Sequence, residues 1–238
     1  MMNESAYKPE RVDVYRLRLD LPESDIATRK QWLSAEEKAR AEKYLSAIKA
    51  REFIITRSSL KKILATTLAE DPANIIIAHA SAGKPYLVCA DRHTCIRFSV
   101  SHSYNMALIA ITQDHAVGVD VEKIRSNIDY ETLSRRFFSS AEFELLQQCN
   151  ATTRLRAFFA VWTRKEAIVK ATGKGIALGL KQFDVSVDPD QPGRVLATRW
   201  EQADMPDWTL LNLETTSNYI ASLAVSSSNV HVRYMDPQ

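Results

Sequence analysis

The stretch Gly118-Val119-Asp120-Val121-Glu122 carries the pattern that decides the fold. Together with Val117, its valines alternate with a glycine and two carboxylates, which is the period-two signature of a half-buried strand. The alternation places both carboxylates on one face, roughly 7 Å apart at about 3.3 Å rise per residue. Two negative charges that close repel each other unless a cation lies between them. The stretch therefore predicts a strand that presents a cation-binding pair.

A second stretch, Trp162-Thr163-Arg164-Lys165-Glu166, runs on to Lys170 in a helical pattern. Trp162, Glu166 and Lys170 are four residues apart, so they lie along one side of the helix. A third carboxylate and a lysine beside the strand pair indicate a Mg²⁺ site next to a phosphate site. The residues alone leave a plainer reading open, in which the strand pair is a solvated edge, the helix pair is an ordinary ion pair and Trp162 belongs to the core.

The composition is that of an ordinary globular protein and excludes several classes. The 238 residues are 45% hydrophobic and 25% charged, with a formal net charge of +2. This balance gives no general bias toward polyanions, so we expect no nucleic-acid partner. The polar first residues do not resemble a signal peptide, and the longest apolar run, Met106 to Ile111, is too short to span a membrane. We therefore expect no membrane partner.

The cysteines and histidines argue against a structural metal site. Cys89, Cys95 and Cys149 fit no C-x-x-C spacing, and the five histidines are scattered along the chain. The thiols are best read as reduced, two of them within strands, which indicates a cytoplasmic protein.

The chain repeats itself. Three short units recur in the same order, at offsets of 106, 105 and 114 residues: Ser34–Glu36 with Ser140–Glu142, Arg51–Ile54 with Arg156–Phe159, and Asn105–Ile111 with Asn218–Val225. The first unit opens a helix with a serine cap, the second begins a long helix, and the third is an apolar strand. We predict an α+β fold of two similar halves, 1–115 and 116–238, that form a pseudo-dimer within a monomeric chain, with a ligand site between them.

Periodicity and turn signals divide the halves into short strands and helices. Expected strands are 12–19, 75–78, 86–89, 98–101, 106–112, 117–122, 183–187, 194–199, 207–215, 218–225 and 230–234. Expected helices are 35–45, 49–69, 129–137, 140–149 and 153–171. Residues 22–30 are expected as a loop, and residues 102–105 as the turn of a hairpin.

These residues resemble the Sfp-type 4′-phosphopantetheinyl transferase family. The matching segments are Gly83-Lys84-Pro85, Phe98-Ser99-Val100-Ser101-His102-Ser103, the stretch 118–122, Arg136-Phe137-Phe138, and 162–167 continuing through 170–175. They occur in family order over roughly residues 34–183. Each is weak alone, whereas the ordered set is specific. The pseudo-twofold architecture of the family also agrees with the internal repeat.

The resemblance implies an enzyme that transfers the 4′-phosphopantetheine moiety of coenzyme A to a serine of an apo acyl or peptidyl carrier protein. The other product would be adenosine 3′,5′-bisphosphate. It implies Mg²⁺, with Mn²⁺ as the alternative, held by Asp120, Glu122 and Glu166. Glu166 would take the proton of the serine hydroxyl, and Lys170 would hold a pyrophosphate oxygen and stabilise the departing bisphosphate.

The resemblance also implies contacts to the phosphates of coenzyme A, from Arg40, Arg51, Lys84, Ser101, His102 and Lys170. Plainer readings stay open: the two arginines as solvated helix residues, and the histidine as a turn residue bonded to backbone. The chain departs from the family pattern at Val121, where some members carry a third polar ligand. It departs again at Glu37, where some place a basic coenzyme contact.

Other functions compete with the transferase. A non-catalytic module that binds carrier proteins or coenzyme A predicts damaged acidic or lysine positions, yet these are intact. A phosphohydrolase would want a DxD or HD pair. A serine hydrolase would want G-x-S-x-G, and adjacent Ser101 and His102 would point to opposite faces of a strand. For carrier docking we expect the segment 137–159, with Phe138 and Phe143 as exposed aromatics.

Overall fold

The strands of the chain form two main sheets in a computed structural model that describes residues 10–88, 96–200 and 207–236. The first sheet has the order β11-β1-β5-β4, with β1 (Glu10–Arg18), β4 (Ile96–Ser103), β5 (Met106–Gln113) and β11 (Val230–Met235). The second has the order β6-β10-β9, with β6 (Val117–Lys123), β9 (Thr209–Asn212) and β10 (Tyr219–Val225). Two short pairs are β2 (Ile77–His79) with β3 (Pro85–Leu87) and β7 (Phe183–Val185) with β8 (Val195–Thr198).

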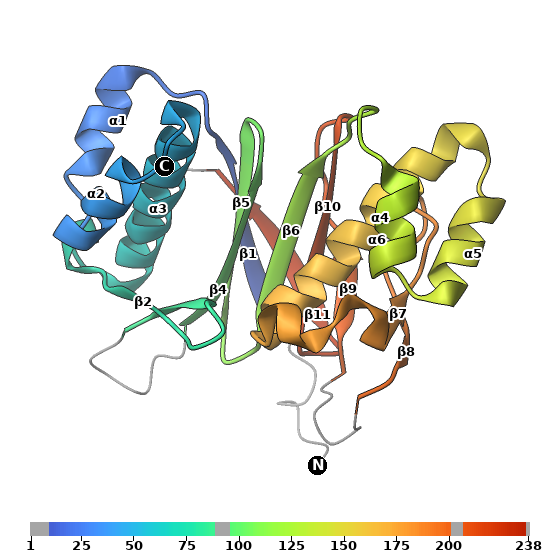
Figure 1. Ribbon diagram of the computed structural model, residues 1–238. Coiled ribbons are helices and arrows are strands. Elements are labelled where there is room, and N and C mark those ends of the chain that lie inside the picture. Colours follow the sequence, from blue (N-terminus) through green and yellow to red (C-terminus); the bar gives the residue numbers. More distant parts are fainter. Residues whose placement is uncertain (1–9, 89–95, 201–206, 237–238) are drawn as a thin grey trace, which may run out of the picture.

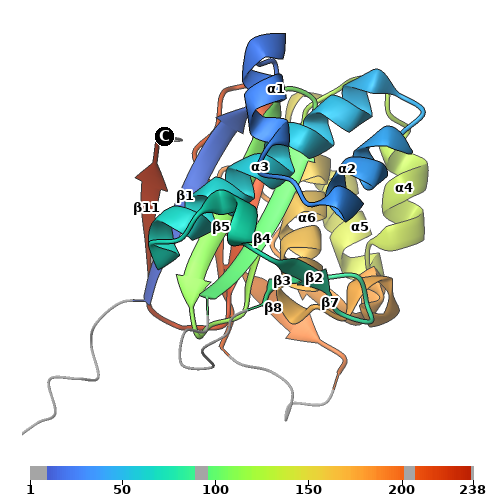
Figure 2. The ribbon, with the colours of Figure 1, turned by 90° about the vertical axis from the view of Figure 1, so that its left-hand side faces the viewer.

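The sheets lie between two groups of helices, so the layer order is helix, sheet, sheet, helix (Figure 1). The first group is α1 (Glu23–Lys30), α2 (Ala35–Glu42) and α3 (Ala47–Leu68), and α3 crosses in front of β1, β5 and β4 (Figure 2). The second group is α4 (Tyr130–Phe137), α5 (Ser140–Gln148) and α6 (Ala151–Thr172). Three apolar clusters hold the layers together, one between the sheets and one under each group of helices. The predicted α+β class is confirmed.

The two helical groups repeat each other in capping and length. Ser34 caps α2 and Ser139 caps α5, each in a capping box with the glutamate three residues on, Glu37 and Glu142. The offset is therefore 105 residues, from 34 to 139, and the predicted second cap, Ser140, is one residue too late. The long helices α3 and α6 that follow are both 22 residues in length. The pseudo-dimer architecture is confirmed by these equivalent elements.

Helix α1 occupies the segment 22–30 that was predicted as a loop, so that prediction is wrong. Its first turn holds Glu23 and Asp25 and its last turn holds two basic residues, a distribution that complements the helix dipole. Only Ile26 is buried. With one apolar contact in eight residues, the helix has no hydrophobic period to detect, and its charge distribution was the remaining signal.

Two connections differ from expectation. The hairpin of β4 and β5 turns at Tyr104 and Asn105, so His102 lies within β4 and not in the turn. Strand β11 pairs in parallel with β1, so it extends the first sheet although it belongs to the second half in sequence. The division of the chain between residues 115 and 116 stays a prediction. Under this division, β11 is a strand of the second half that pairs within the sheet of the first.

Two further expectations concern cysteines and membranes. Cys149 ends α5 as its C-cap, whereas Cys89 and Cys95 lie outside the described residues. Among the helices of the described ranges, none combines the length and the apolar character needed to cross a bilayer.

Gly118 allows β6 to approach α6 closely. A Cβ atom built on Gly118 would lie 1.9 Å from the carbonyl oxygen of Ala167 and 2.5 Å from the backbone nitrogen of Ala171. Both neighbours are backbone atoms of a buried helix, which cannot move away without disturbing its own packing. The glycine of the acidic strand is therefore required by packing, and it fixes α6 against the carboxylates.

We expect Gly118→Ala to lower the free energy of unfolding by about 3 kcal/mol or more, because the added methyl collides with backbone on two sides. Gly83→Ala is the matched control. Its Cβ would meet nothing within 4 Å, and only its φ of +86° opposes the change, at a cost of about 1–2 kcal/mol. Urea unfolding of both variants measures the difference, and equal losses would contradict the close-approach argument.

Candidate active site

A cavity of about 730 Å³ takes its lining from both halves of the chain. The first half contributes Gly83, Lys84, Pro85, Phe98 and Val100, and the second contributes Arg136, Phe137, Trp162, Glu166, Lys170 and Lys181. We predicted a ligand site between the halves, and the lining of this cavity does come from both of them. Trp162 is half-buried and lines the cavity, with its ring edge-on to Phe137 at 5.7 Å. Trp162 also packs against the apolar core that contains Phe158, as predicted, so one residue belongs to both the core and the cavity wall.

Asp120 is the buried centre of the acidic group. It is 5% exposed, and its Oδ1 accepts hydrogen bonds from the Ser101 hydroxyl and the Lys170 ammonium, each at 2.8 Å. Its Oδ2 is buried and has no hydrogen-bond partner among the described residues. Leaving a buried carboxylate oxygen without a donor is costly. Oδ2 is thus an atom at which a cation would be favoured.

Glu122 and Glu166 lie within electrostatic reach of Asp120. Burial raises the pKa of Glu122 above its usual value, and the charge of Asp120 adds to that rise, against a hydrogen bond from Ser103 at 2.8 Å. Burial also raises the pKa of Glu166, with Asp120 and Glu122 adding to the rise and Lys170 opposing it. The structure therefore brings the three predicted carboxylates together.

The carboxylates are gathered but do not form a closed ligand set. Within residues 10–88, 96–200 and 207–236, no three His, Cys, Asp or Glu side chains are arranged so that they could hold a metal ion as they stand. The ammonium of Lys170 neutralises one oxygen of Asp120 instead. Arg125 lies 3.9 Å from Glu122 as a second cation, so three carboxylates with two cationic partners still leave a net negative site. Oxygen-ligated divalent cations prefer such an environment.

Lys170 connects the two halves at the site. Beyond Asp120, its ammonium donates to the carbonyl oxygens of Val119 in β6 at 3.2 Å and Val100 in β4 at 3.5 Å. Its side chain is 30% exposed and lines the cavity, so the cation also faces any anion bound there. The predicted proximity of Lys170 to the strand carboxylates is therefore observed.

Lys84 also lines the cavity and connects the two halves. Its ammonium donates to the carbonyl oxygens of Ala171 at 2.9 Å and Val117 at 3.2 Å, and one of its three N–H groups remains for another acceptor. Burial, with a smaller effect of Arg97, lowers the pKa of Lys84 to about 8.

A second, basic pocket of about 290 Å³ adjoins the cavity, because Gly83, Pro85 and Val100 line both. Its basic lining residues are Arg40, Lys49, Arg57, His79 and His102. Arg40 packs over the ring of Phe53 at 5.1 Å, and burial lowers the pKa of His102 against the opposing charge of Glu52. The structure thus brings two of the predicted coenzyme contacts, Arg40 and His102, into one pocket.

The other two predicted contacts are engaged elsewhere. Arg51 forms an ion pair with Glu23 of α1 at the surface. The Ser101 hydroxyl is bonded to Asp120, on the face of β4 opposite His102, so the expectation that these neighbours face apart is confirmed.

Residues of the basic pocket that sequence reasoning missed had a detectable spacing. Lys49, Phe53 and Arg57 are four residues apart, which places them on one side of α3. The departure at Glu37 also has a structural reason. Glu37 completes the capping box of α2 and forms ion pairs with Arg57 at 3.6 Å and Lys61 at 3.4 Å.

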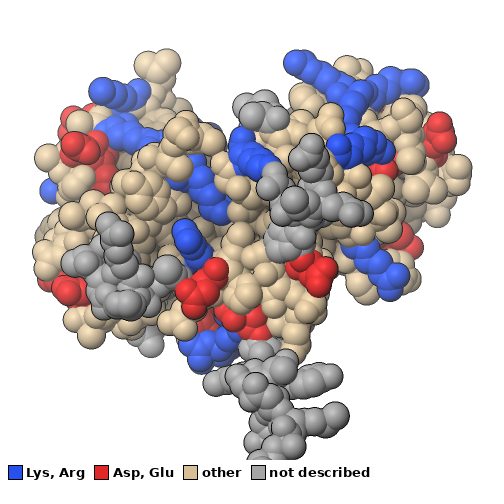
Figure 3. Space-filling model, turned by 90° about the horizontal axis from the view of Figure 1, so that it is seen from below, with Lys and Arg blue, Asp and Glu red and all other residues tan. Residues whose placement is uncertain are grey.

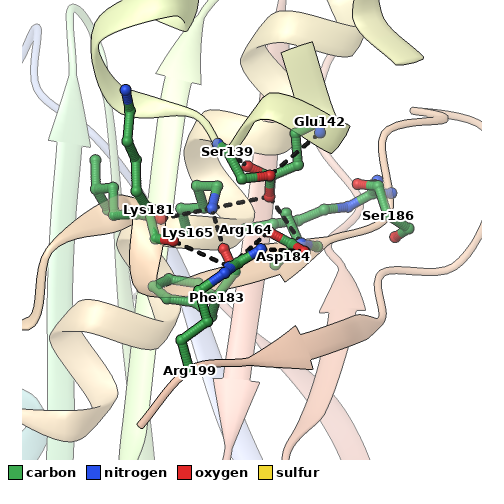
Figure 4. A network of polar contacts seen from close by, with 11 residues as sticks. Ser139, Glu142, Arg164, Lys165, Lys181, Phe183, Asp184, Ser186 and Arg199 are labelled. Atoms are coloured by element: carbon green, nitrogen blue, oxygen red, sulfur yellow. Dashed lines mark hydrogen bonds and ion pairs between the residues drawn. The ribbon is translucent and has the colours of Figure 1, made fainter. Parts of the chain in front are cut away.

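A buried polar network lies behind the site and anchors α6 (Figure 4). Lys165 forms an ion pair with Glu142 at 2.8 Å, with side chains that are 0% and 1% exposed. It also donates to the carbonyl oxygens of Leu180 and Phe183, at 2.7 and 2.6 Å. The neighbouring Arg164 donates to the oxygens of Ser186, Asp188, Gln191 and Asn212. The network ties the helix of Glu166 to the segment that carries Lys181.

The ion pair between Lys61 and Glu37 is the counterpart of this one in the first half, and it provides a comparison. We expect Lys165→Met to lower the free energy of unfolding by about 3–5 kcal/mol, since the buried carboxylate of Glu142 loses its cationic partner and has no access to water. Lys61→Met should cost less, because Glu37 is 14% exposed and keeps Arg57 as a second cation. Chemical denaturation measures both, and a larger loss from Lys61→Met would refute the assignment.

The aromatic residues predicted for carrier docking are differently placed. Phe138 is 1% exposed and stacks on Phe158, so it belongs to the core and the prediction that it is exposed is wrong. Phe143 is half-buried beneath the guanidinium of Arg135, 4.4 Å from its ring. Phe137 and Phe138 are consecutive at the end of α4, so their side chains point in different directions. The sequence did not show which of the two faces outward.

Comparisons with known proteins agree with this architecture. A family model described as the 4′-phosphopantetheinyl transferase superfamily matches residues 116–224, and one described as 4′-phosphopantetheinyl transferase, N-terminal, matches residues 22–114. The chain is 34% identical over 217 residues to the 4′-phosphopantetheinyl transferase HetI of Nostoc sp., covering 91% of this chain and 88% of that protein. It is 29% identical to the 4′-phosphopantetheinyl transferase of Bacillus subtilis, covering 66% of this chain and 68% of that protein.

A vertebrate relative has a longer chain. The L-aminoadipate-semialdehyde dehydrogenase-phosphopantetheinyl transferase of Xenopus laevis is 29% identical over 65% of this chain and 54% of its own. On these matches the chain belongs to the 4′-phosphopantetheinyl transferase superfamily. It is an enzyme of that class, which uses coenzyme A and acts on carrier proteins, and the resemblance drawn from its motifs is confirmed.

Proposed function

We propose that the chain transfers 4′-phosphopantetheine from coenzyme A to a serine of an apo acyl or peptidyl carrier protein, in a reaction that depends on Mg²⁺. One observation carries this proposal. Asp120 is buried beside a cavity that Glu166 and Lys170 line. Lys170 is bonded to one oxygen of Asp120, and the other has no partner within the part of the chain that the structure describes. Such a site is suited to a phosphate group that arrives with a cation.

The residues fit the metal by their chemistry. Asp120, Glu122 and Glu166 would hold Mg²⁺, or Mn²⁺ as the alternative, because burial and, to a smaller extent, the neighbouring carboxylates raise the pKa of both glutamates, and a cation would relieve both effects. The unpartnered Oδ2 of Asp120 supports the same assignment. When bound, the metal would neutralise negative charge on the pyrophosphate of coenzyme A.

The side chains supply the proton transfers. Glu166 would take the proton of the carrier serine, and a carboxyl whose pKa is raised is a stronger base than an ordinary glutamate. The serine oxygen forms a bond to the phosphorus next to the pantetheine arm. The bond from this phosphorus to the bridging oxygen breaks, and that oxygen leaves with adenosine 3′,5′-bisphosphate. Lys170 would hold a pyrophosphate oxygen and donate to the leaving oxygen.

The basic pocket is the proposed site for the remaining coenzyme phosphate. Arg40 and His102 line it, and Lys84 reaches the adjoining cavity from the turn between β2 and β3. Ser101 and Arg51 are the other proposed coenzyme contacts. The Ser101 hydroxyl is bonded to Asp120, so its contact would come from the backbone, and Arg51 is paired with Glu23.

The acidic carrier protein would approach the cavity rim, where Arg136 and Lys181 lie beside Phe137. On the face seen in Figure 3, Lys and Arg side chains form separate groups among neutral and acidic residues. Such local groups of positive charge are suited to docking an acidic protein at one place. We further propose a monomer, since both halves are in one chain, and a cytoplasmic location, which the reading of the cysteines as reduced thiols supports.

Intact-mass spectrometry of an apo carrier protein incubated with this protein, coenzyme A and Mg²⁺ tests the reaction. We expect a gain of one phosphopantetheine, which EDTA abolishes and added Mg²⁺ restores. Glu166→Gln should slow the transfer at least ~100-fold, because the base is lost while the shape is kept. Glu144→Gln, an exposed glutamate of α5, is the matched control.

A different outcome would favour the alternative function. If coenzyme A binds while acyl and peptidyl carriers all stay unmodified, the chain is a non-catalytic module for carrier proteins or coenzyme A, and the transferase proposal fails.

The affinity for coenzyme A should depend on pH through Lys84. With a pKa of about 8, the ammonium is charged below pH 8 and neutral above it. If it contacts a phosphate, the Kd for coenzyme A should be constant below pH 8 and rise roughly tenfold per unit above it. Lys84→Arg should keep the Kd flat over the same range, because arginine stays charged. Calorimetric titration measures both, and a flat wild-type profile to pH 9.5 would remove Lys84 from the site.

A further inference from the structure

A ladder of three serines joins the two sheets. Side chains of alternate residues of β4 accept hydrogen bonds from backbone N–H groups of β6: Ser99 from Val119 at 3.0 Å, Ser101 from Val121 at 3.3 Å and Ser103 from Lys123 at 3.2 Å. Each serine is at most 8% exposed. The serine side chains thus replace the backbone bonds that a neighbouring strand would make, along the seam between the halves.

Two of these serines also bond the acidic side chains. The Ser101 hydroxyl donates to Oδ1 of Asp120 at 2.8 Å, and the Ser103 hydroxyl donates to Oε2 of Glu122 at 2.8 Å. Ser99 is in the same register, but the residue beside its bonded amide is Gly118, which has no carboxylate. The ladder therefore contains two rungs that reach a carboxylate and one that does not.

The bonds decide which carboxylate oxygen remains available. Ser101 and Lys170 both donate to Oδ1 of Asp120, and this fixes the carboxylate plane with Oδ2 free. A hydroxyl has one proton, and that of Ser101 is used here, so Ser101 has none to give to a coenzyme phosphate.

We propose that Ser101 and Ser103 are positioning residues, whose hydroxyl groups orient Asp120 and Glu122 for the divalent cation. The inference rests on the proposed function, because it concerns the same acidic site. It assigns the first half a part in metal binding through hydrogen bonds alone. Ligands held by such supporting bonds typically lose about 10–100-fold in metal affinity when the bond is removed.

The test measures metal and coenzyme binding separately from activity. Calorimetry with Mg²⁺, and electron paramagnetic resonance with Mn²⁺, give the metal Kd of Ser99→Ala, Ser101→Ala and Ser103→Ala. We expect the metal Kd to rise about tenfold or more for Ser101→Ala and Ser103→Ala and to change less than about twofold for Ser99→Ala. All three variants lose one bond to β6, so similar urea midpoints are expected. Ser101→Thr keeps the hydroxyl and should restore most of the metal affinity, and the Kd for coenzyme A of each variant is measured in parallel without metal.

Three results would overturn the proposal. Equal metal Kd values for Ser99→Ala and Ser101→Ala would show a general effect of the seam. A weakened coenzyme Kd in Ser101→Ala with an unchanged metal Kd would make the Ser101 hydroxyl a coenzyme contact. If the wild-type protein transfers phosphopantetheine without binding either metal, the carboxylates bind no cation, and the serines cannot orient them for one. Wild-type protein that neither binds metal nor transfers would instead refute the proposed function, and this inference with it.

Discussion

The alternation of side chains along β6 is the constraint on which both the fold and the site depend. Val117, Val119 and Val121 are buried in the core between the sheets, so the residues between them must face α6 and the cavity. A shift of one residue in the pairing of β6 with β10 would place two carboxylates in that apolar core. The free energy of burying two unpaired charges would strongly disfavour this register. The register of the second sheet is thus set by the same residues that form the acidic site.

Adjacent residues of α6 carry charges in two different environments, one inside the protein and one at the cavity. Arg164 and Lys165 point into the protein, where their terminal nitrogens donate to carbonyl oxygens and, from Lys165, to Glu142. The next residue, Glu166, is turned toward the cavity by the helical rotation and meets other carboxylates instead. Buried charges that are hydrogen-bonded, such as that of Lys165, hold their side chains rigidly. A buried carboxylate beside other carboxylates, such as Glu166, is instead stabilised when a cation binds. The rigidity of the first pair holds the second kind of group in place.

Much of this arrangement could be predicted, because it depends on period and spacing. The period of β6, the helical spacing from Trp162 to Lys170 and the repeated caps are local signals, and they led to the correct sheet strand, helix face and pseudo-dimer. The bonding of Ser101 and the burial of Phe138 depend on which neighbour a side chain meets after folding. No local pattern carries that information. The short helix α1 lacked a pattern altogether, since one buried residue cannot define a period.

The pairing of β1 with β11 has a consequence for the way in which the chain is made. Asp13 and Arg233 form an ion pair at 2.8 Å across the two strands, although 220 residues separate them in sequence. Contacts of such high order form late, because the intervening chain must be ordered before they stabilise anything. On the ribosome, the outer edge of β1 stays without its neighbour until residues 230–235 have been synthesised. An unpaired strand edge can pair with other chains, so this edge of β1 is exposed to such pairing until synthesis of β11 is complete.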